Sequence, residues 1–272
     1  GSSASAHDDS LNLSGFINAS ITITDKDGDS TSASAPIGNL LVFKDDGPDA
    51  QTSGTAVGQV VLDETRPEGG DRGPGATAPN GTDSETINFS ANFVTGSAVD
   101  YGADGAGSVS YTFVLSGTSV GSGLYAIDGT DTSTTDTDGY GQGAEIMLSL
   151  SDNVISGKVG TTTYFTITLD PVTGIATFTQ LLNIWHPTSG TASFDELVAI
   201  TTAAASDIKV VQTVTDSDGD TDTAEINVGQ GVFAIEDDGT FVETVAFTDE
   251  AAAREGEAKA MPSHGELADA MR

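Results

Sequence analysis

The chain has 272 residues and no cysteine, and its 9 Lys and Arg against 41 Asp and Glu give a formal net charge of −32. This length allows one or two domains with sizeable cores. The charge excludes nucleic acids as natural partners and argues against anionic membrane surfaces, because both are bound through cationic side chains. The lack of cysteine excludes disulfides and thiolate metal sites.

In chain order, residues 1–20 are small and polar, and residues 21–48 predict an acidic hairpin followed by an apolar strand and a second acidic turn. Residues 49–60 predict a linker or edge strand, and the proline- and glycine-rich residues 66–85 a long irregular loop. Beyond them, short β-branched and aromatic runs alternate with turn residues. The expected strands cover residues 60–65, 86–89, 108–115, 123–128, 145–150, 154–159, 163–169, 175–180, 210–214, 221–226 and 232–235.

Turn chemistry supports two hairpins, one across Asp152 and Asn153 and one across residues 170–174, where proline fixes φ and glycine supplies a positive φ. Acidic composition can indicate disorder, but the alternating apolar runs favour a folded domain. The pattern predicts an all-β antiparallel β-sandwich. Residues 241–272 favour helix by propensity, and we expect them to be a weakly helical or disordered tail outside the fold.

A carboxylate cluster lies between the expected strands at 210–214 and 221–226. Asp216, Asp218 and Asp220 alternate, with Gly219 before the third, as in a tight turn. Crowded carboxylates repel each other unless a cation neutralises them, and hard oxygen ligands suit Ca²⁺. An EF-hand is excluded, because its invariant glycine position would be Thr221. We interpret the turn as a Ca²⁺ site, with a solvated acidic turn as the alternative.

The same pattern occurs 191 positions upstream, with carboxylates at Asp25, Asp27 and Asp29. Each copy is followed by an apolar run and a second acidic pair, which completes the site or bridges one repeat to the next. The two pairs are Asp45 with Asp46 and Asp237 with Asp238. Such self-similarity predicts a tandem array. We expect residues 1–48 to end a preceding repeat and residues 49–240 to form a complete, calcium-stabilised one.

Further acidic residues are weaker candidates for metal contact. Four of them lie in or beside expected turns: Asp63, Glu64, Asp100 and Asp104. Asp128 lies in a loop with other aspartates, where simple solvation explains the composition equally well.

The ordered landmarks resemble a known family. They include residues 62–64, 101–105, 165–169, 178–180, 186–187 and 195–197, followed by the Asp-Gly-Asp hairpin and an Asp-Asp-Gly turn. In this order they are similar to the repeats of giant RTX-type adhesins and other type I-secreted tandem-repeat proteins of Gram-negative bacteria. The resemblance covers about residues 55–240, with the same hairpin at 21–48. The Gly-Gly-x-Gly-x-Asp nonapeptide of RTX proteins is absent, so no calcium β-roll is expected.

The resemblance implies a secreted cell-surface protein, exported without a cleaved N-terminal signal, with calcium-rigidified domains that act in extension, adhesion and biofilm formation. The partners expected are adjacent repeats of the same chain. The alternative is a Ca²⁺-dependent module that recognises peptide C-termini or glycans on a host or neighbouring cell. Its candidate ligand-binding residues are Trp185, Tyr101 and Asp128, although a core or rim role is the favoured interpretation of Trp185.

An enzyme is not expected. The three histidines, His7, His186 and His264, are far apart in the sequence and support no Ser/His/Asp triad. No long apolar run indicates direct membrane insertion. The leading hypothesis is therefore a structural adhesin repeat that binds Ca²⁺.

Overall fold

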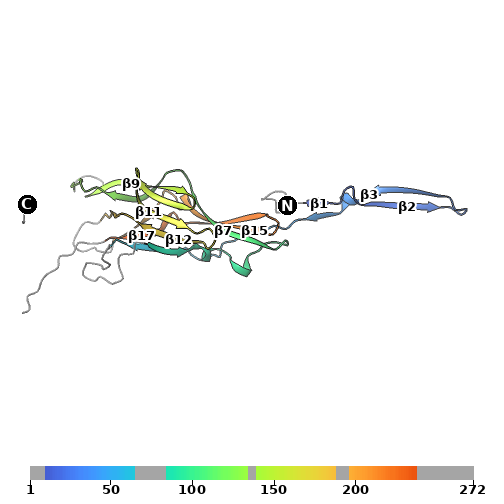
Figure 1. Cartoon of the computed structure of the whole chain (residues 1–272), viewed down its shortest axis with the longest axis horizontal. Coiled ribbons are helices and arrows are strands. Elements are labelled where there is room, and N and C mark those ends of the chain that lie inside the picture. Colours follow the sequence, from blue (N-terminus) through green and yellow to red (C-terminus); the bar gives the residue numbers. More distant parts are fainter. Residues whose placement is uncertain (1–9, 65–83, 134–138, 188–195, 238–272) are drawn as a thin grey trace, which may run out of the picture. The chain divides into compact units, whose positions relative to one another are not determined.

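The computed structural model describes residues 10–64, 84–133, 139–187 and 196–237 (Figure 1), so the expected tail at 241–272 lies outside it. Within these residues the chain forms seventeen strands and short 3-10 helices, with no α-helix. The all-β prediction is confirmed. No helix in the described part of the chain is long and apolar enough to cross a membrane. The 3-10 helices are η1 (Gly38–Leu40), η2 (Phe89–Asn92), η3 (Gly96–Ala98) and η4 (Ala205–Asp207).

The largest sheet is antiparallel and contains both predicted hairpins. Its strand order is β13 (Ile184–Trp185), β8 (Val120–Ile127), β9 (Gln142–Ser151), β10 (Val154–Val159), β11 (Thr162–Leu169), β12 (Ile175–Gln180) and β6 (Ser84–Asn88). Asp152 and Asn153 connect β9 to β10, both with positive φ, as in the turns that match strand twist. The Asn153 side chain also accepts from the Phe113 N–H at 2.9 Å and donates to the Tyr111 carbonyl at 3.0 Å.

Two three-stranded sheets pack with this sheet. One is antiparallel, with the order β16 (Thr221–Asn227), β15 (Ile208–Asp216) and β7 (Ala106–Leu115). Figure 1 shows β7 and β15 side by side, as their backbone register requires. The other has the order β14 (Leu197–Thr201), β17 (Gln230–Glu236) and β5 (Val60–Asp63).

The pairing of β5 with β17 is parallel and therefore departs from the predicted antiparallel pattern. These are the first and last strands of the sandwich, so no short turn connects them and no turn signal reports their direction. Strands β13 and β14 were also not predicted, because they are short and carry no clear alternation.

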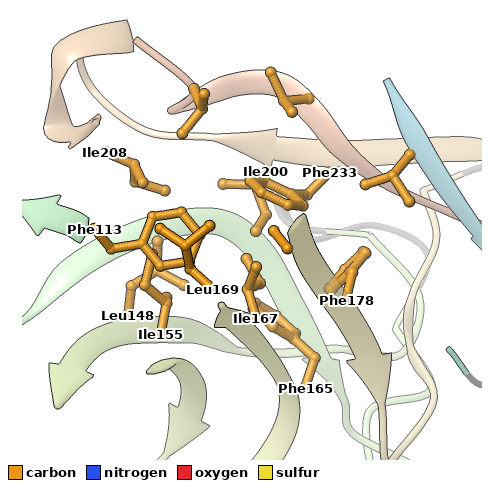
Figure 2. Close-up of a cluster of buried hydrophobic side chains, with 14 of the residues drawn as sticks. Phe113, Leu148, Ile155, Phe165, Ile167, Leu169, Phe178, Ile200, Ile208 and Phe233 are labelled. Atoms are coloured by element: carbon orange, nitrogen blue, oxygen red, sulfur yellow. The ribbon is translucent and has the colours of Figure 1, made fainter. Parts of the chain in front are cut away.

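The core is a single cluster to which all three sheets contribute (Figure 2). Phe165 and Ile167 come from the large sheet, Phe113 and Ile208 from β7 and β15, and Phe233 from β17. The antiparallel β-sandwich prediction is thus confirmed. Strand β15 alternates buried and half-buried residues over its whole length, from Ile208 to Asp216. Because side chains alternate between faces, Asp216 ends the strand on its buried face.

The N-terminal strands contribute nothing to this core. Strand β1 (Ser10–Asn12) pairs with β4 (Val42–Lys44), and β2 (Asn18–Thr24) pairs with β3 (Ser30–Pro36). The predicted hairpin at the first acidic turn is therefore present. Large apolar side chains of this N-terminal part are exposed, unlike those of β15 and β17. They include Leu11, Ile21, Ile23, Leu41, Val42 and Phe43.

Candidate metal centre

The turn between β15 and β16 is built around the side chain of Asp216. Its Oδ1 accepts the N–H groups of Gly219 at 2.9 Å and Asp220 at 2.8 Å, and its own N–H donates to the Asp220 carbonyl at 3.0 Å. Gly219 has φ +106, a backbone conformation that residues other than glycine rarely adopt. The sequence Asp-x-x-Gly-Asp therefore folds locally into a turn that gathers its carboxylates.

Two of these carboxylates are out of contact with solvent. Asp216 is 2% exposed and Asp220 is 1% exposed. Each has a buried Oδ2 with no hydrogen-bond partner among the described residues. One carboxylate oxygen from each of Asp216, Asp218 and Asp220 lies within 4.8 Å of the others. A buried carboxylate without a partner carries a large desolvation cost, which a bound cation removes.

A second segment brings further carboxylates to the turn. Asp45, which precedes the sandwich, and Asp104, from the loop before β7, each place an oxygen within 4.8 Å of one on Asp218. Asp218 thus belongs to both groups and joins them into one centre of five carboxylates. We call Asp45, Asp104, Asp216, Asp218 and Asp220 the junction centre.

Backbone hydrogen bonds beside the junction centre join the segment at residues 46–49 to the loop at residues 100–103. The Ala103 N–H donates to the Asp46 carbonyl at 3.3 Å, and the Asp49 N–H donates to the Asp100 carbonyl at 3.1 Å. The loop approaches so closely at Gly102 that a Cβ there would lie 1.9 Å from the Asp46 carbonyl oxygen. On the other side, Asp222 accepts the Ala50 N–H at 2.8 Å.

The acids of the junction centre perturb each other's protonation. A hydrogen bond between Asp45 and Asp104 lowers the pKa of Asp45 and raises that of Asp104. Burial, and then a hydrogen bond to Asp45, raise the pKa of Asp220. Crowded carboxylates behave in this way because only some of them can carry charge at once unless a cation is present.

The first copy of the turn has the same local hydrogen bonds. Asp25 Oδ1 accepts the N–H of Asp29 at 3.0 Å, the Asp25 N–H donates to the Asp29 carbonyl at 2.9 Å, and Gly28 has φ +104. Asp25, Asp27 and Asp29 are all exposed, although their oxygens also lie within 4.8 Å of one another. Among the described residues, nothing takes the places that Asp45 and Asp104 occupy around the second copy.

A different cluster forms where the parallel strands end. Glu64 follows β5 and Asp237 follows β17, and both lie with His186, which follows β13; one ligand atom of each is within 4.8 Å of the others. Burial alone would lower the pKa of His186, but the neighbouring Glu64 carboxylate, together with the charges of Asp237 and Glu196, raises it.

The remaining candidates for metal contact lie outside these clusters. Asp46 contributes its backbone carbonyl to the loop contact with Ala103, and Asp100 accepts the Gly102 N–H at 3.0 Å through its side chain. Asp63 is half-buried in β5, opposite Glu236 of β17. The structure brings none of these three side chains into a carboxylate cluster within the ranges it describes. Asp238 lies outside the described residues.

Two of the candidate ligand-binding residues lie beside one loop residue, Gly141: a Cβ added there would be 3.9 Å from the Trp185 ring and 4.0 Å from the Asp128 carbonyl. Trp185 donates its Nε1–H to the Tyr140 carbonyl at 2.9 Å and packs edge-on against Tyr125. Asp128 accepts the N–H and hydroxyl of Thr130, and these hydrogen bonds lower its pKa. Over the ranges that the structure covers, no hydrogen bond or ring contact joins Tyr101 to either residue. The peptide- or glycan-binding alternative remains a prediction.

Two residues in or beside these acidic clusters, His186 and Asp222, were not predicted from the sequence. His186 was considered only as a member of a catalytic triad, although it lies in the landmark at 186–187. Asp222 continues the alternation of Asp216, Asp218 and Asp220, and this periodicity was a usable signal for its role beside the centre.

Comparison with known proteins gives one match. The model of a family described as a domain of unknown function (DUF5801) matches residues 59–229, which span β5 to the end of β16. No curated protein and no solved structure matches the chain. The matched region contains Asp104, Asp216, Asp218 and Asp220 but begins after Asp45.

Proposed function

The chain belongs to the family of DUF5801 domains, and from this premise and the junction centre we propose that it is a calcium-binding repeat domain of a large secreted bacterial surface adhesin. In this proposal Ca²⁺ binds in the junction centre, stiffens the connection between consecutive units, and so supports extension and adhesion at the cell surface.

The observation that carries the calcium proposal is the pair of unpartnered buried oxygens on Asp216 and Asp220. A solvated acidic turn would leave its carboxylates in water, as the first copy does. Ca²⁺ accepts six to eight oxygen ligands with flexible geometry and takes carboxylates in mono- or bidentate form, and the junction centre supplies such oxygens from three chain segments.

The position of Asp45 supports the role in extension. It belongs to the acidic pair that follows the first copy of the hairpin, yet it contacts the hairpin of the second copy. An ion bound there crosslinks the end of the first unit to the hairpin of the next unit. The position of Asp45 favours the bridging role over the alternative that the acidic pair completes the site of its own copy.

The tandem array is supported by the contrast between the two copies. In the second copy Phe233 and Ile235 of β17 are fully buried, whereas the corresponding apolar residues of the first copy, Leu41 and Phe43, are exposed. The first copy thus has the apolar residues that a packed repeat buries, but these residues are exposed. A preceding repeat of the same kind would cover them.

Calcium titration by calorimetry and by thermal unfolding tests the proposal. At a Ca²⁺ concentration one hundred times the Kd, native-state binding adds about 2.7 kcal/mol to the free energy of unfolding, which corresponds to a rise in Tm of roughly 5–10 °C for a domain of this size. Asp218→Asn should abolish this rise. The matched control is Asp27→Asn, the same position in the exposed turn, which should leave it unchanged.

Hydrogen exchange then locates the effect. On addition of EDTA, exchange in residues 45–50 should increase, while the hairpin of β11 and β12 stays protected. An unchanged Tm in EDTA would refute the calcium proposal, and equal loosening of both regions would show that the ion holds the whole fold rather than the junction.

A further inference from the structure

The cluster of Glu64, His186 and Asp237 lies at an edge of the sandwich that the junction centre does not use. Strands β5 and β17 are parallel, with Asp63 opposite Glu236 in the register. Their carboxyl ends therefore reach the same edge, and the next residue of each strand is an acid, Glu64 or Asp237. The Glu64 N–H donates to the Glu236 carbonyl at 3.1 Å, which continues the pairing to this point.

Glu64 is held rigidly and buried. Its side chain is 3% exposed, and its Oε1 accepts hydrogen bonds from the Gln180 side chain at 2.5 Å and from the Ile184 N–H at 2.7 Å. These two bonds fix one carboxylate oxygen and direct the other, Oε2, toward His186. The arrangement resembles the way in which outer hydrogen bonds orient a metal-ligating carboxylate.

His186 faces Glu64 with both ring nitrogens unsatisfied. Its side chain is 3% exposed, and neither Nδ1 nor Nε2 has a hydrogen-bond partner among the described residues. The distance from Nε2 to Glu64 Oε2 is 3.9 Å, which is too long for a hydrogen bond. A buried imidazole without any hydrogen-bond partner is costly, and a metal ion bound to one of its ring nitrogens removes that cost.

We propose that Glu64, His186 and Asp237 form a second metal site, selective for a divalent transition metal such as Zn²⁺ rather than for Ca²⁺. One ligand atom of each residue lies within 4.8 Å of the others. Zn²⁺ binds imidazole nitrogen and carboxylate oxygen at about 2.0–2.2 Å, so a small closure of the three side chains brings all of them into its coordination shell.

The ligand type separates this site from the junction centre. Ca²⁺ is bound through oxygen atoms, whereas imidazole suits Zn²⁺ and its neighbours in the first transition series. Three protein ligands also leave a fourth coordination position, which water or another oxygen donor fills. The site does not share a residue with the junction centre, so it stands whether or not the calcium proposal holds.

Cobalt spectroscopy on the full chain tests the assignment, because Co²⁺ replaces Zn²⁺ and its visible absorption reports nitrogen and oxygen coordination. His7 and His264 are first changed to Gln, so that His186 is the only remaining histidine. We expect a visible band at one Co²⁺ per chain that stoichiometric Zn²⁺ removes. A large excess of Ca²⁺ should leave the band in place.

Three variants make the test specific. His186→Gln should abolish the band, and Asp237→Asn, which changes a half-buried ligand and leaves the buried pair intact, should weaken Co²⁺ binding at least tenfold. Asp218→Asn, in the junction centre, should leave the band unchanged. Far-ultraviolet circular dichroism confirms that each variant is folded. Absence of the band in the parent, or its persistence in folded His186→Gln, would overturn the proposal.

Discussion

Ile23 in β2 and Val214 in β15 occupy the same place, two residues before the first aspartate of their acidic turns, yet Ile23 is 62% exposed and Val214 is fully buried. Strand β15 lies between β16 and β7, whereas within the described ranges β2 pairs with β3 alone. The same local sequence thus has two environments, and the difference comes from what lies beside the hairpin.

This contrast predicts opposite sensitivities to truncation. Val214→Ala should lower the free energy of unfolding by about 1–3 kcal/mol, because it removes buried methyl groups. Ile23→Ala should change it by less than about 0.5 kcal/mol, although it removes more atoms. Urea unfolding at saturating Ca²⁺ measures both values. Comparable losses would mean that the first hairpin is also packed in solution.

The close approach at Gly102 gives a prediction that changes no carboxylate. Gly102 has φ +70, and Gly102→Ala would place a methyl group against the Asp46 carbonyl. Gly96→Ala is the matched control, since Gly96 has φ +65 but no atom within 4 Å of the added carbon. Both changes cost about 1 kcal/mol through the backbone conformation.

Only Gly102→Ala should also move residues 45–47 away from the loop. We expect its Ca²⁺ affinity to fall at least tenfold, which is about 1.4 kcal/mol, while Gly96→Ala binds normally. Calorimetric titration gives both constants. Normal binding by Gly102→Ala would show that Asp45 is not a ligand.

The turn between β11 and β12 predicts a pH dependence that is independent of metal. Asp170 Oδ1 accepts the N–H groups of Thr173 at 3.0 Å and Val172 at 2.8 Å, and these hydrogen bonds lower its pKa below 3.8. The unfolded chain binds this proton more tightly, so the carboxylate's contribution is present above about pH 3.9 and is lost as the pH falls through the lower, folded-state pKa.

Asp170→Ala should therefore lower Tm by a constant amount at neutral pH, and the deficit should shrink below about pH 4. Asp170→Asn keeps an uncharged acceptor, so it separates the hydrogen bonds from the charge. Thermal scans of the three proteins from pH 7 to pH 3 measure the differences. A deficit that is the same at every pH would show that the charge contributes nothing.

Local signals account for the elements that could be predicted. Residues Asp152 and Asn153, and the turn at 170–174, specify tight turns by their own backbone preferences, and both hairpins form as predicted. The parallel pairing of β5 and β17 has no such signal, because almost the whole domain separates the two strands. The same limit explains why β13, only two residues long, was missed.

The candidate sites divide in the same way. Asp216, Asp218 and Asp220 could be found from the sequence because a single turn brings them together. Asp45 and Asp104 were recognised as candidates, but their convergence on Asp218 depends on how two loops meet. His186 was not recognised as a ligand, since Glu64 and Asp237 reach it only through the parallel ends of β5 and β17.

The strand pattern, the two acidic turns and their duplication could be predicted from the sequence, because alternation and turn preferences are properties of a few neighbouring residues. Which of the two turns is buried, and which acids surround it, depends on long-range contacts. Asp216 and Asp220 are buried because strand β7 and the segment carrying Asp45 lie against their turn, and the sequence around the turn contains neither.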